Sequence, residues 1–333
     1  MSDIESNMNN IIEVKSLGKN FGDLEAVKNI SFEVKKREIF GFLGPNGAGK
    51  TTTINMLCTM LKPNHGTASV NGYSIISSPN EVRKSIGIIF QENTLDEKLT
   101  ANENLLLHCR FYKIPRKERE SRIKEALNIV ELSDKRNKIV ETFSGGMKRR
   151  LEIARGLLHY PKVLFLDEPT LGLDPQTRAH VWEFILKLKE KAGITMFLTT
   201  HYMEEAEICS RVAIIDYGKL IALDTPDELK SKVGGDIIEI STLDNKAAKK
   251  EIETKYNKEV TENQKIISFK VDKGHKFLVN FIKNFKTPIK SINLRRPTLN
   301  DVFLKLTGRQ IRDEEVSAKD LMKKRMKMHG RMR

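Results

Sequence analysis

Cysteine, long apolar runs and an apolar N-terminal segment are all scarce or absent in this sequence. Its 333 residues include three cysteines, Cys58, Cys109 and Cys209, which are far apart and form no CxxC motif. This odd, dispersed set predicts reduced thiols in a core rather than a disulfide framework or a zinc site. No stretch approaches the ~20 consecutive apolar residues of a membrane-spanning helix. The polar first ten residues predict no secretory signal, so we expect an intracellular protein.

Positive charge is abundant and unevenly distributed. The formal net charge is +14, and residues 236–333 contribute 24 basic and 13 acidic residues, a net +11. Residues 1–235 carry the remaining +3. This asymmetry predicts a domain boundary near Gly234 and Gly235. It also predicts that the appended region has an anionic partner of its own, either lipid headgroups or nucleic acid.

Short β-branched, apolar runs alternate with helical segments along the first two thirds of the chain. This alternation is typical of an α/β domain with a largely parallel sheet. A charged stretch at about 92–143 is helical in character and predicts a helical subdomain inserted into that domain. The expected core strands are 39–43, 86–90, 163–166, 195–199 and 212–215.

The same alternation begins again after the glycine pair and predicts a small α/β domain. Its last helix should follow Pro297, be capped by Thr298 with Asp301 three residues on, and end at Gly308. Strands are expected at 237–240, 266–271 and 289–294, and helices at 246–256 and 275–285. The predicted layout is a polar N-terminal extension at 1–10, a large domain at 11–234, the small domain at 235–308 and a basic tail at 309–333.

A glycine-rich loop follows the strand that ends at Leu43. The segment from Gly44 to Thr51 satisfies the GxxxxGK[ST] pattern and precedes a helical run. In such a loop, backbone N–H groups converge on phosphate oxygens, Lys50 reaches the β and γ phosphates, and the Thr51 hydroxyl can ligate Mg²⁺. An ordinary glycine-rich turn is the alternative interpretation. The predicted ATP-binding residues are Gly44, Pro45, Asn46, Gly47, Ala48, Gly49, Lys50, Thr51 and Thr52.

Two acids, Asp167 and Glu168, follow the strand 163–166. They therefore lie at the carboxyl end of a parallel strand, where ligands of such sheets bind. Asp167 would help to hold Mg²⁺, and Glu168 could accept the proton of the attacking water. A strand ending in two acids is as often a surface turn, but the phosphate-binding loop upstream favours the catalytic interpretation.

The segment 143–150, Phe-Ser-Gly-Gly-Met-Lys-Arg-Arg, predicts another helix N-terminus. Ser144 can cap the helix, and Gly145 and Gly146 expose their backbone N–H groups. This segment resembles the LSGGQ signature that defines ABC ATPases. In that family the signature meets the γ-phosphate of an ATP held by a second subunit, so the resemblance implies a head-to-tail homodimer with two ATP molecules. Phe143 and Met147 replace the family Leu and Gln, which removes any hydrogen bond of the Gln side chain.

The resemblance extends to four further positions. Gln91 matches the Q-loop glutamine, which senses the metal and the γ-phosphate, and Asp174 matches the D-loop aspartate. His201 matches the switch histidine, and Phe21 matches the aromatic residue that stacks on adenine, usually Tyr in the family. The simple alternatives are a structural histidine and a core phenylalanine. The resemblance thus implies a catalytic set of Glu168, His201, Gln91 and Lys50, and metal ligands Thr51, Gln91 and Asp167.

The signature run and the segment 295–308 together resemble the daunorubicin-resistance branch of ABC ATPases, which serves export permeases. The resemblance implies an ATPase on the inner face of the membrane that pairs with a separate transmembrane permease. The basic tail could then touch anionic lipid. A soluble ABC ATPase acting on the ribosome or on nucleic acid is less favoured, because the chain has one P-loop and no sustained heptads. A regulator without turnover is disfavoured by Glu168 and His201. The transported cargo stays open.

Overall fold

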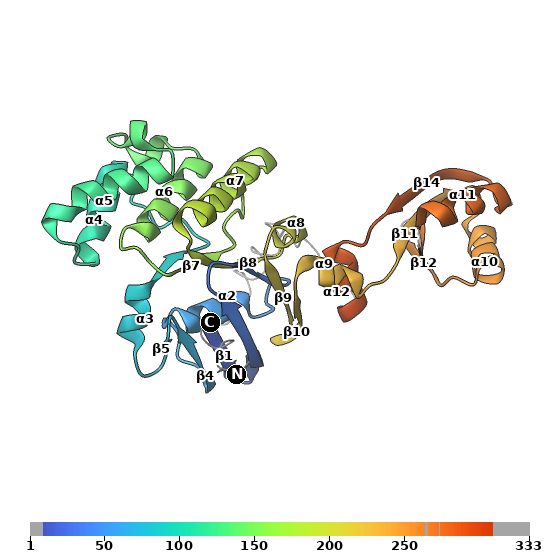
Figure 1. Cartoon of the computed structure of the whole chain (residues 1–333), viewed down its shortest axis with the longest axis horizontal. Helices are drawn as coiled ribbons and strands as arrows, with labels where there is room; N and C mark the ends of the chain where they lie inside the picture. The colour runs from blue at the N-terminus through green and yellow to red at the C-terminus, as the bar shows by residue number, and fades with distance from the viewer. Residues whose placement is uncertain (1–8, 264–265, 273, 309–333) are drawn as a thin grey trace, which may run out of the picture. The chain divides into compact units, whose positions relative to one another are not determined.

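The computed structural model describes residues 9–263, 266–272 and 274–308 (Figure 1). Their contacts form two compact units, residues 9–223 and residues 224–308. The first eight residues of the predicted N-terminal extension and the whole predicted basic tail lie outside the described residues. Within the described ranges, no helix is both long enough and apolar enough to cross a membrane.

A six-stranded sheet in the order β10-β9-β3-β8-β7-β6 forms the centre of the first unit. The five strands from β9 to β6 are parallel to one another, and every residue of β3, β7 and β8 is buried. Uniform burial explains why β3 and most of β7 read as apolar runs. The strands are β3 (Ile39–Leu43), β6 (Ile86–Ile89), β7 (Val163–Asp167), β8 (Thr195–Thr200), β9 (Arg211–Asp216) and β10 (Lys219–Asp224). The predicted fold class, with its largely parallel sheet, is confirmed.

A second, antiparallel sheet was not predicted from the sequence. Its order is β2-β1-β4-β5, and it packs on the first sheet through aromatic rings. The Phe32 ring of β2 lies 5.5 Å from that of Phe40 and 5.6 Å from that of Phe42, between ring centroids. Each such pair contributes about 0.5 to 1.5 kcal/mol beyond the area it buries. The strands are β1 (Asn10–Phe21), β2 (Leu24–Lys35), β4 (His65–Val70) and β5 (Tyr73–Ser74).

Two helices, α4 (Ala101–Phe111) and α5 (Arg116–Ile129), lie in the segment predicted to be helical (green in Figure 1). Both pack against α6 (Gly145–Leu157). Helix α4 begins with a capping box, in which the Thr100 hydroxyl accepts from the Glu103 N–H and the Glu103 carboxylate accepts from the Thr100 N–H. The other helices of this unit are α2 (Lys50–Leu57), α3 (Pro79–Ser85), α7 (Pro175–Ala192) and α8 (Met203–Glu207).

The second unit is a four-stranded antiparallel sheet in the order β12-β13-β11-β14. Ile252 of α10 and Phe281 of α11 are fully buried on this sheet, as the predicted small α/β domain requires. The second unit begins at residue 224, before Gly234 and Gly235, because α9 precedes the two glycines and contacts α12 of the same unit. The elements are α9 (Pro226–Ser231), β11 (Asp236–Thr242), α10 (Asn245–Tyr256), β12 (Val260–Asn263), β13 (Ile266–Val271), α11 (Gly274–Asn284), β14 (Ile289–Arg295) and α12 (Leu299–Thr307).

An ion-pair network fixes the last helix to this sheet. Arg295 donates to both carboxylate oxygens of Asp301, at 2.6 and 3.0 Å, and to Glu239 at 2.6 Å. Asp301 also accepts from the Thr298 N–H at 2.8 Å, which completes the predicted capping box. Burial acts to raise the pKa of Asp301, but the hydrogen bonds from Arg295 and Thr298 outweigh it, and the pKa lies below its ordinary value.

This network predicts an acid-sensitive α12. A carboxyl group with a depressed folded pKa stabilises the fold above its unfolded pKa, about 3.9 for Asp, and loses that contribution as the pH falls through the folded pKa. We expect hydrogen exchange in α12, corrected for the intrinsic rate, to accelerate about tenfold as Asp301 becomes protonated. The Asp301→Asn variant should lack this pH-dependent part. Equal acceleration in both proteins would show that Asp301 is not its cause.

Candidate functional site

The predicted phosphate-binding loop connects β3 to α2. Gly49 has φ of +105°, and a Cβ at this position would lie 2.6 Å from the Ala26 carbonyl oxygen. A side chain here is therefore excluded by both conformation and space. Asn46 and Gly47 are exposed at the tip of the loop, whereas Thr51 and Thr52 lie in the first turn of α2.

The Lys50 side chain lies beneath the loop. Its Nζ donates to the carbonyl oxygens of Gly44, at 2.8 Å, and Pro45, at 3.1 Å. The same Nζ lies 3.1 Å from Glu168 Oε1, and both side chains are more than nine-tenths buried. The structure therefore brings the loop lysine and the second acid of β7 into direct contact.

The two predicted acids lie where β7 ends. The Thr51 hydroxyl is 3.4 Å from Asp167 Oδ1, so a helix hydroxyl and a strand carboxylate converge. Thr199, at the end of β8, donates to the same carboxylate oxygen and accepts from the Glu168 N–H at 3.0 Å. Thr199 was not predicted as a site residue. The one signal for it in the sequence was a hydroxyl near the end of the strand that precedes His201. Glu168 has φ of +45°, a strained conformation for a non-glycine residue.

Glu168 also approaches His201. Its Oε2 lies 3.3 Å from His201 Nδ1, and the imidazole is nine-tenths buried. Burial acts to raise the pKa of Glu168, but the contacts with His201 and Lys50 outweigh it, and the pKa lies below its ordinary value. The carboxylate therefore stays ionised at neutral pH, as a proton acceptor requires.

The signature-like segment caps α6, as predicted. The Ser144 side chain accepts from the Met147 N–H at 3.3 Å. A Cβ on Gly146 would lie 2.6 Å from Cγ2 of Thr177, and a Cβ on Gly145 would lie 3.1 Å from Leu173. A side chain at either glycine of the signature would therefore have to displace Leu173 or Thr177 in the segment that follows β7.

Three further predicted residues lie at the surface. Gln91 is exposed two residues after the end of β6, and Asp174 caps α7, with its Oδ1 accepting from the Thr177 N–H at 3.0 Å. The Phe21 ring is 49% exposed at the end of β1, so it is not a core residue. Within the described part of the chain, no hydrogen bond joins these residues or Ser144 to the P-loop.

Both units match known families. Residues 27–171 match the family described as ABC transporter, and residues 225–307 match the C-terminal domain of DrrA1-3-like ATP-binding proteins. The linearmycin resistance ATP-binding protein LnrL of Bacillus subtilis is 37% identical over 320 residues, covering 91% of this chain and 100% of that protein. The chain belongs to the ABC transporter ATP-binding proteins. The daunorubicin resistance ATP-binding protein DrrA2 of Streptomyces coeruleorubidus is 36% identical, covering 93% and 98% of the two chains.

Solved structures agree with this assignment. CbiO1 from Clostridium perfringens, part of the ABC transporter complex cbiONQ, aligns with a TM-score of 0.63 at 28% identity over 75% of this chain and 97% of that chain. The ATP-binding cassette MJ0796, solved as a dimer with ADP and Pi, aligns with a TM-score of 0.57 at 29% identity over 64% and 98%. The predicted membership of the ABC ATPases, and of their daunorubicin-resistance branch, is confirmed.

Arg149, the third residue after the signature glycines of this ABC ATPase, has no role predicted by the sequence motifs. Its buried guanidinium donates to the carbonyl oxygens of Phe90 and Pro169, both at 2.6 Å, and to Glu152 at 2.8 Å. Glu152 in turn accepts from the N–H of Thr94, three residues after Gln91, at 3.0 Å, and Arg155 donates to the Thr94 hydroxyl at 2.6 Å. Helix α6 is thus fixed to both sides of the Q-loop and to the segment after β7. Only the contacts, and no local sequence pattern, identify this cluster.

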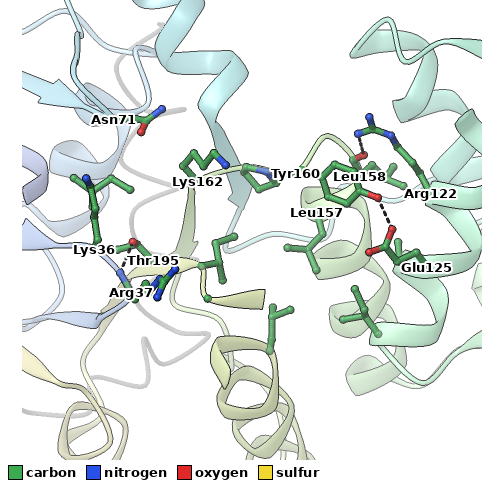
Figure 2. Close-up of a pocket in the computed structure, with 17 residues that line it drawn as sticks. Lys36, Arg37, Asn71, Arg122, Glu125, Leu157, Leu158, Tyr160, Lys162 and Thr195 are labelled. Atoms are coloured by element: carbon green, nitrogen blue, oxygen red, sulfur yellow. Dashed lines mark hydrogen bonds between the residues drawn. The ribbon is translucent and has the colours of Figure 1, made fainter. Parts of the chain in front are cut away.

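A cavity of about 400 Å³ lies at the N-terminal ends of β7 and β8 of this ABC ATPase, away from the P-loop (Figure 2). Its wall includes Lys162, directly before β7, and Thr195, the first residue of β8, and it faces Leu157 at the end of α6. On the helical side, the Tyr160 hydroxyl donates to Glu125. None of the predicted site residues lines this cavity, so the candidate site is the strand edge that carries the P-loop.

Proposed function

We propose that this chain hydrolyses ATP and thereby powers export through a separate membrane permease. The observation that carries the proposal is the contact of Glu168 with both Lys50 and His201, at 3.1 and 3.3 Å, beside a P-loop. LnrL and DrrA2, which are similar over nine-tenths of the chain, are named for resistance to linearmycin and daunorubicin. The test is ATP turnover by the full chain, alone and with the permease that co-purifies with it.

The chain's residues divide the chemistry of ATP hydrolysis among them. Backbone N–H groups of the P-loop and the Lys50 ammonium bind the phosphates, and Phe21 offers an exposed ring for the adenine. Glu168 accepts the proton of the attacking water, and His201 holds the Glu168 carboxylate and contacts the γ-phosphate.

The oxygen atoms near the P-loop fit Mg²⁺. This ion prefers oxygen ligands and is usually held by one or two carboxylates together with substrate phosphates. The Thr51 hydroxyl and the Asp167 carboxylate, 3.4 Å apart, would hold the ion, and Gln91 would approach from β6. When bound, Mg²⁺ would neutralise charge on the β and γ phosphates. Among the described residues, no group of three or more His, Cys, Asp or Glu side chains could hold a metal ion.

Each ATP site is proposed to need two chains arranged head to tail. Ser144 and Gly145 are exposed at the N-terminus of α6, and in the described residues no hydrogen bond joins them to the P-loop of their own chain. A helix N-terminus of this kind favours a phosphate. We propose that it contacts the ATP held by Lys50 of a second copy, with Asp174 at the same interface. The MJ0796 cassette, similar over 64% of this chain, is a dimer.

The proposed location is the cytoplasmic face of the membrane, under the permease, with the basic tail as a second contact. Residues 319–333 carry seven basic residues and one acid. Near an anionic leaflet each Lys or Arg contributes about 1 kcal/mol. At physiological salt, a chain that ends at Gly308 should therefore bind anionic vesicles at least tenfold more weakly than the full chain, and this difference should shrink as the salt concentration rises.

Vesicle co-sedimentation measures this effect of the tail directly. Neutral vesicles serve as the control, and neither chain should bind them appreciably. Equal binding of the full and truncated chains to anionic vesicles would reject the contact and leave the tail as a solvated segment.

A further inference from the structure

A buried carboxylate outside the proposed catalytic set joins two segments of the site. Glu205, in the short helix α8, is 2% exposed. Its Oε1 accepts a hydrogen bond from the Thr170 hydroxyl, and its Oε2 accepts one from the Thr200 hydroxyl at 2.5 Å. Both threonines are 1% exposed, so both oxygens of an inaccessible carboxylate are held by hydroxyl groups from two different segments.

The two segments carry different parts of the proposed machinery. Thr170 follows the acids of β7 and directly precedes the D-loop, residues 171–174, and its carbonyl oxygen accepts from the Leu173 N–H at 3.2 Å. Thr200 is the last residue of β8 and directly precedes His201. Its hydroxyl accepts from the Tyr202 N–H at 2.9 Å. The backbone on both sides of His201 is therefore held by the hydroxyl that Glu205 binds.

The backbone of Thr200 extends this connection to the phosphate-binding loop. Its carbonyl oxygen accepts from the Gly44 N–H at 3.2 Å. A second contact also joins the D-loop side to the histidine side, since the Arg178 guanidinium of α7 lies 3.8 Å from the centre of the Tyr202 ring. The backbone N–H of Arg178 donates to the Asp174 carbonyl oxygen at 2.9 Å, so this contact begins at the D-loop aspartate itself.

We propose that Glu205 is a positioning residue that holds the D-loop and His201 in one fixed relation. A carboxylate is costly to bury unless its oxygens are hydrogen-bonded. Displacing either threonine would leave one Glu205 oxygen without its hydrogen bond, and this cost opposes the displacement. A partner chain that contacts Asp174 thereby also sets the position of His201 and of the Glu168 carboxylate 3.3 Å from it. Dimer contact and ATP hydrolysis are coupled inside one chain through Glu205. The proposal rests on the proposed function, because it concerns the same ATP site.

The isosteric variant Thr170→Val tests the proposal, because it removes one hydroxyl and leaves Thr200 and its contacts in place. Misplacement of a catalytic group by about 1 Å can cost about 10²-fold in rate. We therefore expect kcat for ATP to fall at least about tenfold, with KM and the ATP dissociation constant within about twofold of wild type. Thr195→Val is the matched control: it removes an equally buried hydroxyl from the other end of β8, and its kcat should be unchanged.

Two further variants separate positioning from a general structural role. Glu205→Ala should lower kcat more than Thr170→Val does, and adding Thr170→Val to it should cause no further loss, because the shared contact is already gone. Glu205→Gln can still accept from one threonine and donate to the other, so it should recover most of the turnover. Wild-type kcat in Thr170→Val, or an equal extra loss in the Glu205→Ala background, would overturn the proposal.

Failure of this proposal can be distinguished from failure of the proposed function. If the wild-type chain hydrolyses ATP and Glu168→Gln does not, the proposed function stands whatever the Thr170 variant does. If Glu205→Ala does not fold, the kcat of Thr170→Val against that of Thr195→Val still decides the question.

Discussion

Glu168→Gln is expected to reduce steady-state ATP hydrolysis by about 10² to 10⁴-fold, the usual effect of losing a positioned general base. Glutamine has the same shape and cannot accept the proton of the attacking water. Its side chain still fits between Lys50 and His201, which lie within 3.3 Å of the carboxylate. ATP binding should therefore persist, and an ATP-bound dimer should accumulate. Turnover, ATP affinity and dimer mass measured on one preparation test all three expectations.

Glu204→Gln is a suitable control for this experiment. Glu204 is an exposed glutamate in the first turn of α8, three residues after His201, and carries the same change of charge. Its turnover should equal that of the wild type. If Glu168→Gln also hydrolyses ATP at a near-normal rate with the permease present, Glu168 is not the base.

Mixing two inactive variants is expected to restore part of the activity. Lys50→Ala removes the ammonium under the P-loop, and Ser144→Arg places a large cation at the N-terminus of α6. Neither variant alone should hydrolyse ATP, because both sites of each homodimer are defective. If each site combines Lys50 of one chain with Ser144 of the other, one site of a mixed dimer carries both defects and the other carries none. Half of the sites in mixed dimers are then intact.

The mixed-dimer experiment needs a direct measure of pairing. Differently tagged chains purified in sequence give dimers that contain one copy of each. Turnover in this fraction, and none in either homodimer, is the expected result. Absence of turnover in verified mixed dimers would contradict the shared site, provided that a mixed dimer of Lys50→Ala with wild type is active and so demonstrates that the two sites are independent.

The parallel core could be predicted from the sequence because most residues of its strands are buried and the strands contain short apolar runs. The expected strand 39–43 coincides with β3. In contrast, β1 includes Lys15, Ser16 and Lys19, and its pairing with β2 shifts register several times. An interrupted alternation of this kind gives no period-2 pattern, so the antiparallel sheet was missed.

The contacts among the candidate site residues follow the predicted motifs only in part. Lys50, Asp167, Glu168 and His201 were all predicted, and three of them are in direct contact. The partners that hold these residues are fixed by contacts between distant positions. Glu205 and Thr170, for instance, are 35 residues apart and meet only because β7 and β8 are neighbours in the sheet.

The cluster of Arg149, Glu152 and Arg155 in α6 restricts how this sequence can diverge. All three side chains are at least nine-tenths buried, and Glu152 lies between the two cations. Losing Glu152 alone leaves two buried cations without their carboxylate, which is far more destabilising than replacing the whole set. Mutation must therefore pass through a destabilised intermediate sequence or change several positions together. We expect these three positions to covary during evolution, although none of them contacts ATP in the proposed mechanism.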